Sequence, residues 1–419
     1  MLNAAASLAQ TEMTPLPPAP PRPPIGQVQF GNVTVTPFVT LAHIGIDNNV
    51  MNTSGEPRSD FTATVSPQIK SLYTNGRFDL EATAASDYVF YKTFRDQAGL
   101  APRVSVRAEY RFSPRMAVFS NDELASFKDR PTVEIDTRSR RTVASASAGV
   151  RLGLSRRADL ELTARRRATL YASGVFFRGI HLRDTLNEQR TEGAAVMVYK
   201  ATPYTTIRTI ASIENLRFPL SRERDGLSRE IAVGFKFSPR ALIAGDAQIG
   251  YRMFRSSSAL QPDFDGPVVD GRVTYALTET TGLRVGGHRD LVSSFDPVHP
   301  YLLETRYEGA VQQRLGRQFD IGVDYTAVDT RYRTLLTLAT LAGDRDAPLH
   351  DAVTTYGLSV GLLTRHWGRY AVYVSRWGRT SDFDASRNYR NTRVGLMIGS
   401  TRWLTGQSTH GFFVDTPGL

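Results

Sequence analysis

The feature that most constrains the fold is a regular alternation of large apolar residues with small or charged ones. It is clearest in two consecutive runs, Glu230 to Phe237 and Ala241 to Arg255, which the short turn Ser238-Pro239-Arg240 joins. Successive side chains of a β-strand point to opposite faces, so each run predicts a strand with one apolar and one polar face. Two such strands around a tight turn predict a β-hairpin. Because this unit recurs along the chain, the sequence predicts an all-β protein.

Short turns and long polar loops alternate between the predicted strands. Short turns are expected at Asn75-Gly76, Ser113-Pro114-Arg115, Arg156-Arg157, Pro203-Tyr204, Ser238-Pro239-Arg240, Thr280-Thr281, Gly316-Arg317 and His366-Trp367. Long loops are expected at 48–60, 95–102, 129–140, 174–190, 217–227, 256–266, 295–300, 334–350 and 380–388. Together they predict a single closed antiparallel transmembrane barrel of about 18 strands, with short periplasmic turns and long extracellular loops. The turn spacing also occurs in propellers, but a propeller packs four short strands into each period, and here each period holds two long ones.

Hydropathy and charge exclude several other classes of protein. No apolar run approaches the roughly 18 residues that a membrane-spanning helix needs, whereas a membrane barrel carries its apolar residues at every second position. Cysteine is absent, which excludes disulfides, thiolate catalysis and cysteine-based zinc sites. The net charge is +10. The basic residues are scattered rather than gathered in one patch, so nucleic-acid binding is not predicted.

The polar side chains of the strands are expected to line a water-filled lumen, because a barrel of this size encloses more volume than the apolar side chains could fill. The candidate pore-lining residues are Arg103, Arg107, Glu109, Arg111, Lys236, Arg252, Arg284, His288, Glu304, Arg306 and Glu308. Four aspartates, Asp246, Asp290, Asp320 and Asp324, share the same face.

A ladder of arginines lies on one predicted strand, since Arg103, Arg107 and Arg111 share a face. Rings or ladders of arginine favour anions in a pore. The alternative is that the arginines pair with acidic residues such as Glu304 and brace the wall. The sequence leaves both interpretations open.

One arginine and two loops have uncertain places in this scheme. Arg166 falls on the lipid face, where an arginine at the membrane midplane costs about 2–4 kcal/mol. We therefore expect a bulge that turns it inward, or an earlier end of its strand. Loops 174–190 and 334–350 are expected on the surface rather than folded into the pore.

The chain divides into three parts. Residues 1–27 are expected to be an export-signal remnant and a proline-rich periplasmic spacer, residues 28–404 the barrel, and residues 405–419 a tail. The assembly signal of the barrel is expected either in the motif Arg393-x-Gly395-x-x-Ile398 or in Phe412-Phe413.

Several stretches resemble the outer-membrane proteins called putative β-barrel porin 2. They are Pro37-Phe38-Val39-Thr40, Asp47-Asn48-Asn49-Val50, Ser66-Pro67 with Asn75-Gly76, and Gly286 to Tyr301 followed by Tyr307-Glu308-Gly309. The resemblance covers most of the chain from Val33 to Leu404 and rests on strand patterns and turn residues. It implies an outer-membrane pore, or a barrel that accompanies exopolysaccharide export, and it transfers no functional residues.

Signals for enzymatic chemistry are weak. The seven histidines show no metal-ligand spacing, and neither a G-x-S-x-G motif nor a phosphate-binding loop is present. His288, Asp290 and Ser293 or Ser294 lie close in sequence, which permits a serine-hydrolase hypothesis. A pore-lining histidine explains the same residues more simply, so neither an enzyme nor a cofactor is predicted.

The leading hypothesis is a passive outer-membrane pore for anionic or sugar-rich solutes, accessory to exopolysaccharide secretion. Its expected partners are outer-membrane lipid, a polysaccharide or small anionic solute, and a periplasmic export partner that would bind the N-terminal segment. The second hypothesis is a plugged scaffolding barrel that binds a periplasmic or surface partner. The third is an outer-membrane hydrolase.

Overall fold

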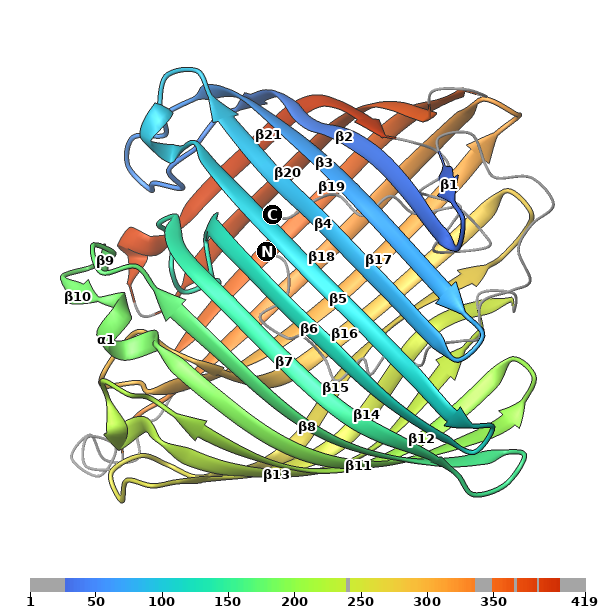
Figure 1. Ribbon diagram of the computed structural model, residues 1–419. Helices are drawn as coiled ribbons and strands as arrows, with labels where there is room; N and C mark the ends of the chain where they lie inside the picture. Colours follow the sequence, from blue (N-terminus) through green and yellow to red (C-terminus); the bar gives the residue numbers. More distant parts are fainter. Residues whose placement is uncertain (1–26, 239–241, 336–348, 365–367, 383, 400–419) are drawn as a thin grey trace.

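The computed structural model describes residues 27–238, 242–335, 349–364, 368–382 and 384–399. These residues form a closed antiparallel barrel of eighteen strongly tilted strands (Figure 1). The barrel strands are β2 (Val33–Asp47), β3 (Asp60–Asn75), β4 (Phe78–Tyr91), β5 (Gly99–Ser113), β6 (Met116–Asp129), β7 (Ser139–Gly153), β8 (Ala158–Tyr171), β11 (Glu188–Thr202), β12 (Thr205–Arg217), β13 (Gly226–Phe237), β14 (Ile243–Ser256), β15 (Phe264–Ala276), β16 (Thr281–Ser293), β17 (Tyr301–Leu315), β18 (Phe319–Arg333), β19 (His350–Thr364), β20 (Gly368–Ser381) and β21 (Tyr389–Gly399). The predicted fold and strand number are confirmed.

The remaining elements are short. The strand β1 (Val28–Phe30) pairs with the start of β2, and β9 (Phe176–Phe177) pairs with β10 (Ile180–His181). The helices are α1 (Leu182–Leu186), η1 (Arg95–Gln97), η2 (Arg222–Arg224) and η3 (Ala385–Arg387). None of the helices in the described ranges is long and apolar enough to span a membrane. Figure 1 shows α1, β9 and β10 at the long-loop end of the barrel.

The two faces of each strand differ as the alternation predicts. In β13, Ile231 and Val233 are exposed on the outer face, while Glu230 and Ala232 are buried on the inner face. This arrangement turns the apolar side chains toward lipid and leaves the polar ones for the lumen.

The barrel closes where β21 pairs with β2. On the inner side of this seam, Arg393 donates to Asp47 Oδ2 at 2.7 Å, and its guanidinium lies 5.1 Å from the centre of the Trp377 ring. A Cβ atom on Gly45 would collide with the carbonyl oxygen of Val394 across the seam. The close approach of the two closing strands therefore requires glycine at position 45.

Strand boundaries differ from the predicted ones around β4 and β5. The sequence predicts a strand through Phe94 and a loop through Pro102, whereas β4 ends at Tyr91 and β5 begins at Gly99. Pro102 is tolerated within β5. It lies opposite Ser86 of β4, and the pairing of β5 with β6 begins only at Arg103. The N–H group that proline lacks is therefore not needed for pairing with β6. The turn residues 239–241 and 365–367 lie outside the described part of the chain.

The prediction for Arg166 is wrong. Strand β8 pairs without a bulge with both neighbours and continues to Tyr171. Arg166 therefore stays on the outer face, where it donates to Gln189 Oε1 at 3.0 Å. It lies in the half of β8 next to the long loops, and an outward charge costs less there than at the midplane.

Candidate functional site

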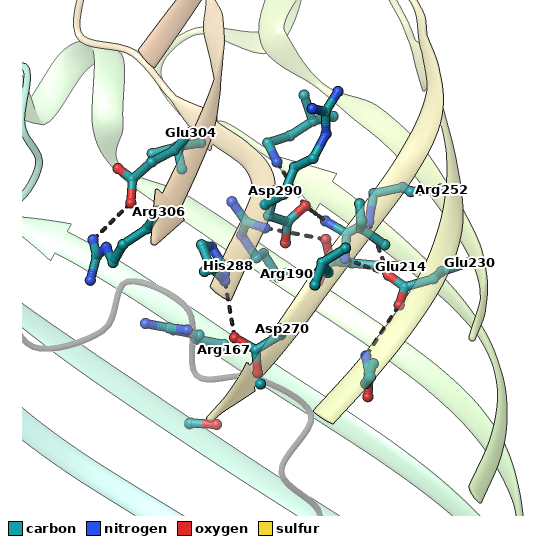
Figure 2. A pocket seen from close by; sticks show the side chains of 18 of the residues that line it. Arg167, Arg190, Glu214, Glu230, Arg252, Asp270, His288, Asp290, Glu304 and Arg306 are labelled. Atoms are coloured by element: carbon teal, nitrogen blue, oxygen red, sulfur yellow. Dashed lines mark hydrogen bonds and ion pairs between the residues drawn. The ribbon is translucent and has the colours of Figure 1, made fainter. Parts of the chain in front are cut away.

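A cavity of about 1000 Å³ lies inside the barrel against the wall from β5 to β17 (Figure 2). It extends from Pro131 and Leu186 at the long-loop end to Lys236 and Phe237 at the short-turn end. The structure places seven of the candidate residues on its lining, namely Arg103, Lys236, Arg252, His288, Glu304, Arg306 and Glu308. Asp246 and Asp290 line it as well.

The remaining candidates lie on inward-facing positions beside the cavity. Glu109 is buried and accepts from Arg151 at 2.9 Å. Arg107 and Arg111 share its face of β5, and Arg284 occupies the same face of β16 as His288. Asp320 is buried within an ion pair with Arg369, and Asp324 follows it on the same face of β18.

Charges of both signs alternate on the cavity wall. Arg252 bridges two strands, because it contacts Glu230 at 2.6 Å and Asp290 at 2.5 Å. Arg190 holds Glu188 at 3.0 Å. In Figure 2, Arg252 points toward both Glu230 and Asp290, so that positive and negative side chains do not form separate patches. The wall carries as many aspartates and glutamates as arginines and lysines, so it offers hydrogen-bond donors and acceptors side by side.

The long-loop end of the lumen is narrowed by the loop of residues 130–138, between β6 and β7. Glu134 and Ile135 are each 1% exposed, although they belong to a loop. Val133 packs against Val328 of β18 and Val353 of β19 on the other side of the barrel. This loop therefore crosses the lumen instead of standing in solvent.

Polar contacts fasten the loop at its far end. Arg379 of β20 contacts Asp136 at 3.0 Å, and Arg387 of η3 donates to the carbonyl oxygen of Glu134 at 2.9 Å. The Glu134 carboxylate accepts from Ser294 Oγ at 2.6 Å and from the backbone N–H of Phe295 at 3.1 Å. Burial raises the pKa of Glu134 to about 7.

The end of the β16–β17 hairpin folds into the lumen as well. The pairing of β15 with β16 ends at Val269 and Arg289, although both strands continue. Past this point Leu291 packs on a buried apolar cluster that consists of Leu216, Phe218, Phe254, Phe264, Tyr301 and Leu303. Ser293 Oγ donates to Glu188 on β11 at 2.9 Å, so the hairpin leans across the lumen toward β11.

The comparisons agree with this architecture. Residues 20–398 match the model of the family described as "Putative beta-barrel porin 2". The chain belongs to this family. The porin accordingly resides in the outer membrane, as its sequence predicts. No match was found among curated proteins.

Solved structures similar to this porin are outer-membrane proteins. OpdK from Pseudomonas aeruginosa is 12% identical, with 87% of this chain and 98% of that chain covered and a TM-score of 0.49. OccK2 (OpdF) from Pseudomonas aeruginosa, solved in complex with glucuronate, is 11% identical, with 87% and 98% covered and a TM-score of 0.47. OccAB3 from Acinetobacter baumannii is 9% identical, with 87% and 98% covered and a TM-score of 0.46.

The predicted arginine ladder of the porin is fully partnered. Its three arginines bond acidic or amide groups on neighbouring strands, as Arg103 with Asp87 at 2.9 Å, Arg107 with Asn121 at 2.8 Å, and Arg111 with Asp79 at 2.6 Å. Arg306 likewise holds Glu304 at 2.7 Å. These contacts favour the bracing interpretation for the ladder.

The residues of the hydrolase hypothesis do not form a triad. His288 Nδ1 lies 3.0 Å from Asp270 Oδ1, whereas Ser293 bonds Glu188 and Ser294 bonds Glu134. Neither serine hydroxyl is positioned on the imidazole, which a nucleophile and its base require. Within the described residues of the porin, no group of three or more His, Asp or Glu side chains is arranged to hold a metal ion.

Sequence reasoning missed the role of loop 130–138. The signal available was local, because Val133 and Ile135 flank Glu134 in an otherwise polar loop. The surface prediction for loop 174–190 holds for its first part, where Phe176 and Arg178 are exposed. It is wrong for α1, since Leu182 and Leu186 are buried against Ile135 and Phe295. In loop 334–350, residues 336–348 lie outside the described part of the porin.

Proposed function

We propose that the porin is a passive channel for small, hydroxyl-rich solutes, acidic sugars among them. The observation that carries the proposal is the balanced, ion-paired wall of the cavity. Carboxylates such as Glu214 and Asp290 accept from solute hydroxyl groups, and arginines such as Arg252 donate to hydroxyl or carboxylate oxygens. A solute that carries both kinds of group can exchange contacts with this wall as it passes, and selection follows from size and hydrogen bonding.

Single-channel recording in a planar bilayer tests this function. We expect discrete conductance steps and a reversal potential close to zero under a salt gradient, because the wall has no excess of either charge. Arg252→Gln removes one cation from the wall and should shift the reversal potential toward cation preference. Arg229→Gln is the matched control, because Arg229 lies on the outer face of β13.

Two outcomes would contradict the proposal. Strong ion selectivity of the unmodified porin would show that the paired charges do not balance in the lumen. A folded barrel without conductance would favour the second candidate function, a plugged scaffolding barrel. Loop 130–138 supports that candidate, because it is buried across the long-loop end of the lumen.

An accessory role in exopolysaccharide secretion is a prediction from the family resemblance. If it holds, cells that lack the porin should export less polysaccharide, and normal export would contradict it. The periplasmic partner proposed for residues 1–27 would bind a segment that lies almost entirely outside the described residues. Removal of that segment should then abolish co-purification of the partner without loss of conductance.

A further inference from the structure

Exposed arginines gather on the outer, membrane-facing side of the barrel near its long-loop end. We call this set the arginine girdle, and its members are Arg140, Arg166, Arg217, Arg229, Arg255, Arg331, Arg333, Arg376 and Arg390. They come from eight strands between β7 and β21. The girdle lies outside the lumen and is separate from the wall described above.

The burial pattern of each strand fixes the outward direction. Arg229 alternates with buried Ser228 and Glu230 and shares its face with exposed Ile231. Arg376 in the same way shares the outer face of β20 with exposed Val374, opposite buried Trp377. The girdle residues therefore emerge from the same surface that meets lipid.

The arginine girdle lies in the half of the barrel next to the long loops, and its members nearest the middle are Arg166 and Arg376. Arg217 is the last residue of β12, and Arg140 and Arg390 are the second residues of β7 and β21. On the outer face of the described strands, no exposed arginine or lysine lies in the half next to the short turns. Since the long loops of such barrels are extracellular, the girdle lies at the level of the outer leaflet.

Most of the girdle has no counter-charge among the residues that the structure describes. Three members have partners, as Arg166 bonds Gln189, Arg255 pairs with Asp265, and Arg331 pairs with Asp329. The other six make no side-chain hydrogen bond or ion pair to any residue in the described ranges; they are Arg140, Arg217, Arg229, Arg333, Arg376 and Arg390. The inward-facing ladder, in contrast, is fully partnered.

Like charges also meet within this surface. Arg140 lies directly opposite Lys128 in the pairing of β6 with β7. Like charges directly opposite each other are destabilising. The Lys128 ammonium is satisfied by the carbonyl oxygens of Asp96 and Ala98, whereas the Arg140 guanidinium has no acceptor among the described residues. An arginine beside lipid is costly unless its charge is compensated or reaches the headgroup layer. These observations call for an anionic group that the surroundings provide.

We propose that the arginine girdle binds the phosphate groups of phosphorylated lipid headgroups in the outer leaflet, as lipopolysaccharide carries them. The planar guanidinium group donates two parallel hydrogen bonds to phosphate, so an exposed arginine is suited to this contact. The acidic residues Asp263, Asp265 and Asp329 pair with Arg255 and Arg331, which leaves the other members of the girdle for lipid.

Binding of purified lipopolysaccharide to the refolded, full-length porin in detergent micelles tests the proposal. The girdle variant combines Arg217→Gln, Arg229→Gln and Arg376→Gln. The control variant combines Arg115→Gln, Arg157→Gln and Arg317→Gln, which removes the same charge from exposed residues of the short turns. We expect the girdle variant to bind at least about tenfold more weakly, since each cation near a charged lipid surface contributes measurably. The control should bind as the unmodified porin does.

Two further measurements make the test decisive. Dephosphorylated lipopolysaccharide should bind the unmodified porin as weakly as intact lipopolysaccharide binds the girdle variant, and added salt should weaken only the phosphate-dependent part. A variant with lysine at the same three positions keeps the charge and should retain most of the affinity. Equal binding by girdle and control variants, or no effect of dephosphorylation, would overturn the proposal. Heat-dependent gel mobility of each variant shows that its barrel is folded.

Discussion

At the scale of single residues, Glu134 is the most unusual group. It is a buried carboxyl in a loop, near the cations Arg387 and Arg224 and the anion Asp296. Burial raises its pKa from 4.5 to about 7 in spite of the hydrogen bonds from Ser294 and Phe295. The seated loop therefore binds the proton more tightly than a released loop would. The contribution of this proton to the stability of the buried loop is fully present below pH 4.5, and it is lost as the pH rises through 7.

This titration predicts a pH-dependent channel. Between pH 5 and pH 8, the free energy that favours the buried position of loop 130–138 over a released one should fall by up to about 3 kcal/mol. The mean conductance should rise as a result. Glu134→Gln keeps the shape without the charge change and should remove the dependence. Glu56→Gln, in the exposed loop between β2 and β3, is the control and should behave as the unmodified porin. A fall in conductance with rising pH would contradict the role of Glu134 in holding the loop.

Gly45 has an equally local role at the seam. A methyl group at this position would collide with the carbonyl oxygen of Val394, so Gly45→Ala should impair the pairing of β2 with β21. We expect a smaller fraction of heat-resistant, fast-migrating barrel on gels after refolding. Gly55→Ala makes the same change where nothing lies within 4 Å, and it should fold normally. Equal yields of the two variants would show that the seam tolerates the methyl group.

At the scale of elements, the strands follow local rules and loop 130–138 does not. Alternation in a strand is visible in the sequence because neighbouring residues face opposite sides, and β13 shows it without exception from Gly226 to Phe235. The seat of the loop depends on Val328 and Val353, which lie on strands far along the chain. The local pattern shows that Val133 and Ile135 are apolar, but it does not show which strands they contact. Arg166 shows the same limit, since the cost of its charge depends on depth in the membrane, which the sequence does not specify.

The loop should be releasable by one substitution at its far anchor. The Arg379 side chain is fully buried and pairs with Asp136 and Asp351. Arg379→Ala leaves both carboxylates without this partner, and loss of one member of a buried pair costs about 3–5 kcal/mol. We expect larger and noisier conductance steps in bilayers as the loop leaves its seat.

The control for this release is Arg376→Ala. It removes an arginine from the same strand but on the outer face, so the loop keeps its anchor. Conductance steps of unchanged size in the Arg379 variant would mean that loop 130–138 does not limit the flow of ions.

At the scale of the whole molecule, β21 closes the barrel and its neighbour β20 holds loop 130–138 at the long-loop end of the lumen. The barrel itself could be predicted from the sequence, because strand number, turn length and face follow from composition and spacing. The balanced cavity could be predicted only in part. The sequence indicates which side chains face inward, but not that Arg252 would hold both Glu230 and Asp290. Pairing across strands depends on register, which the spacing alone leaves open.

The crossing loop also has a consequence for the order of assembly. Loop 130–138 belongs to the first third of the chain, but Arg379 and Arg387, which hold it, follow 245 and 253 residues after Glu134. Until β18 to β21 have joined the wall, the loop has no seat. The loop can take its position only when strands from both halves of the chain stand in one wall. Closure of the barrel and narrowing of its pore are therefore coupled.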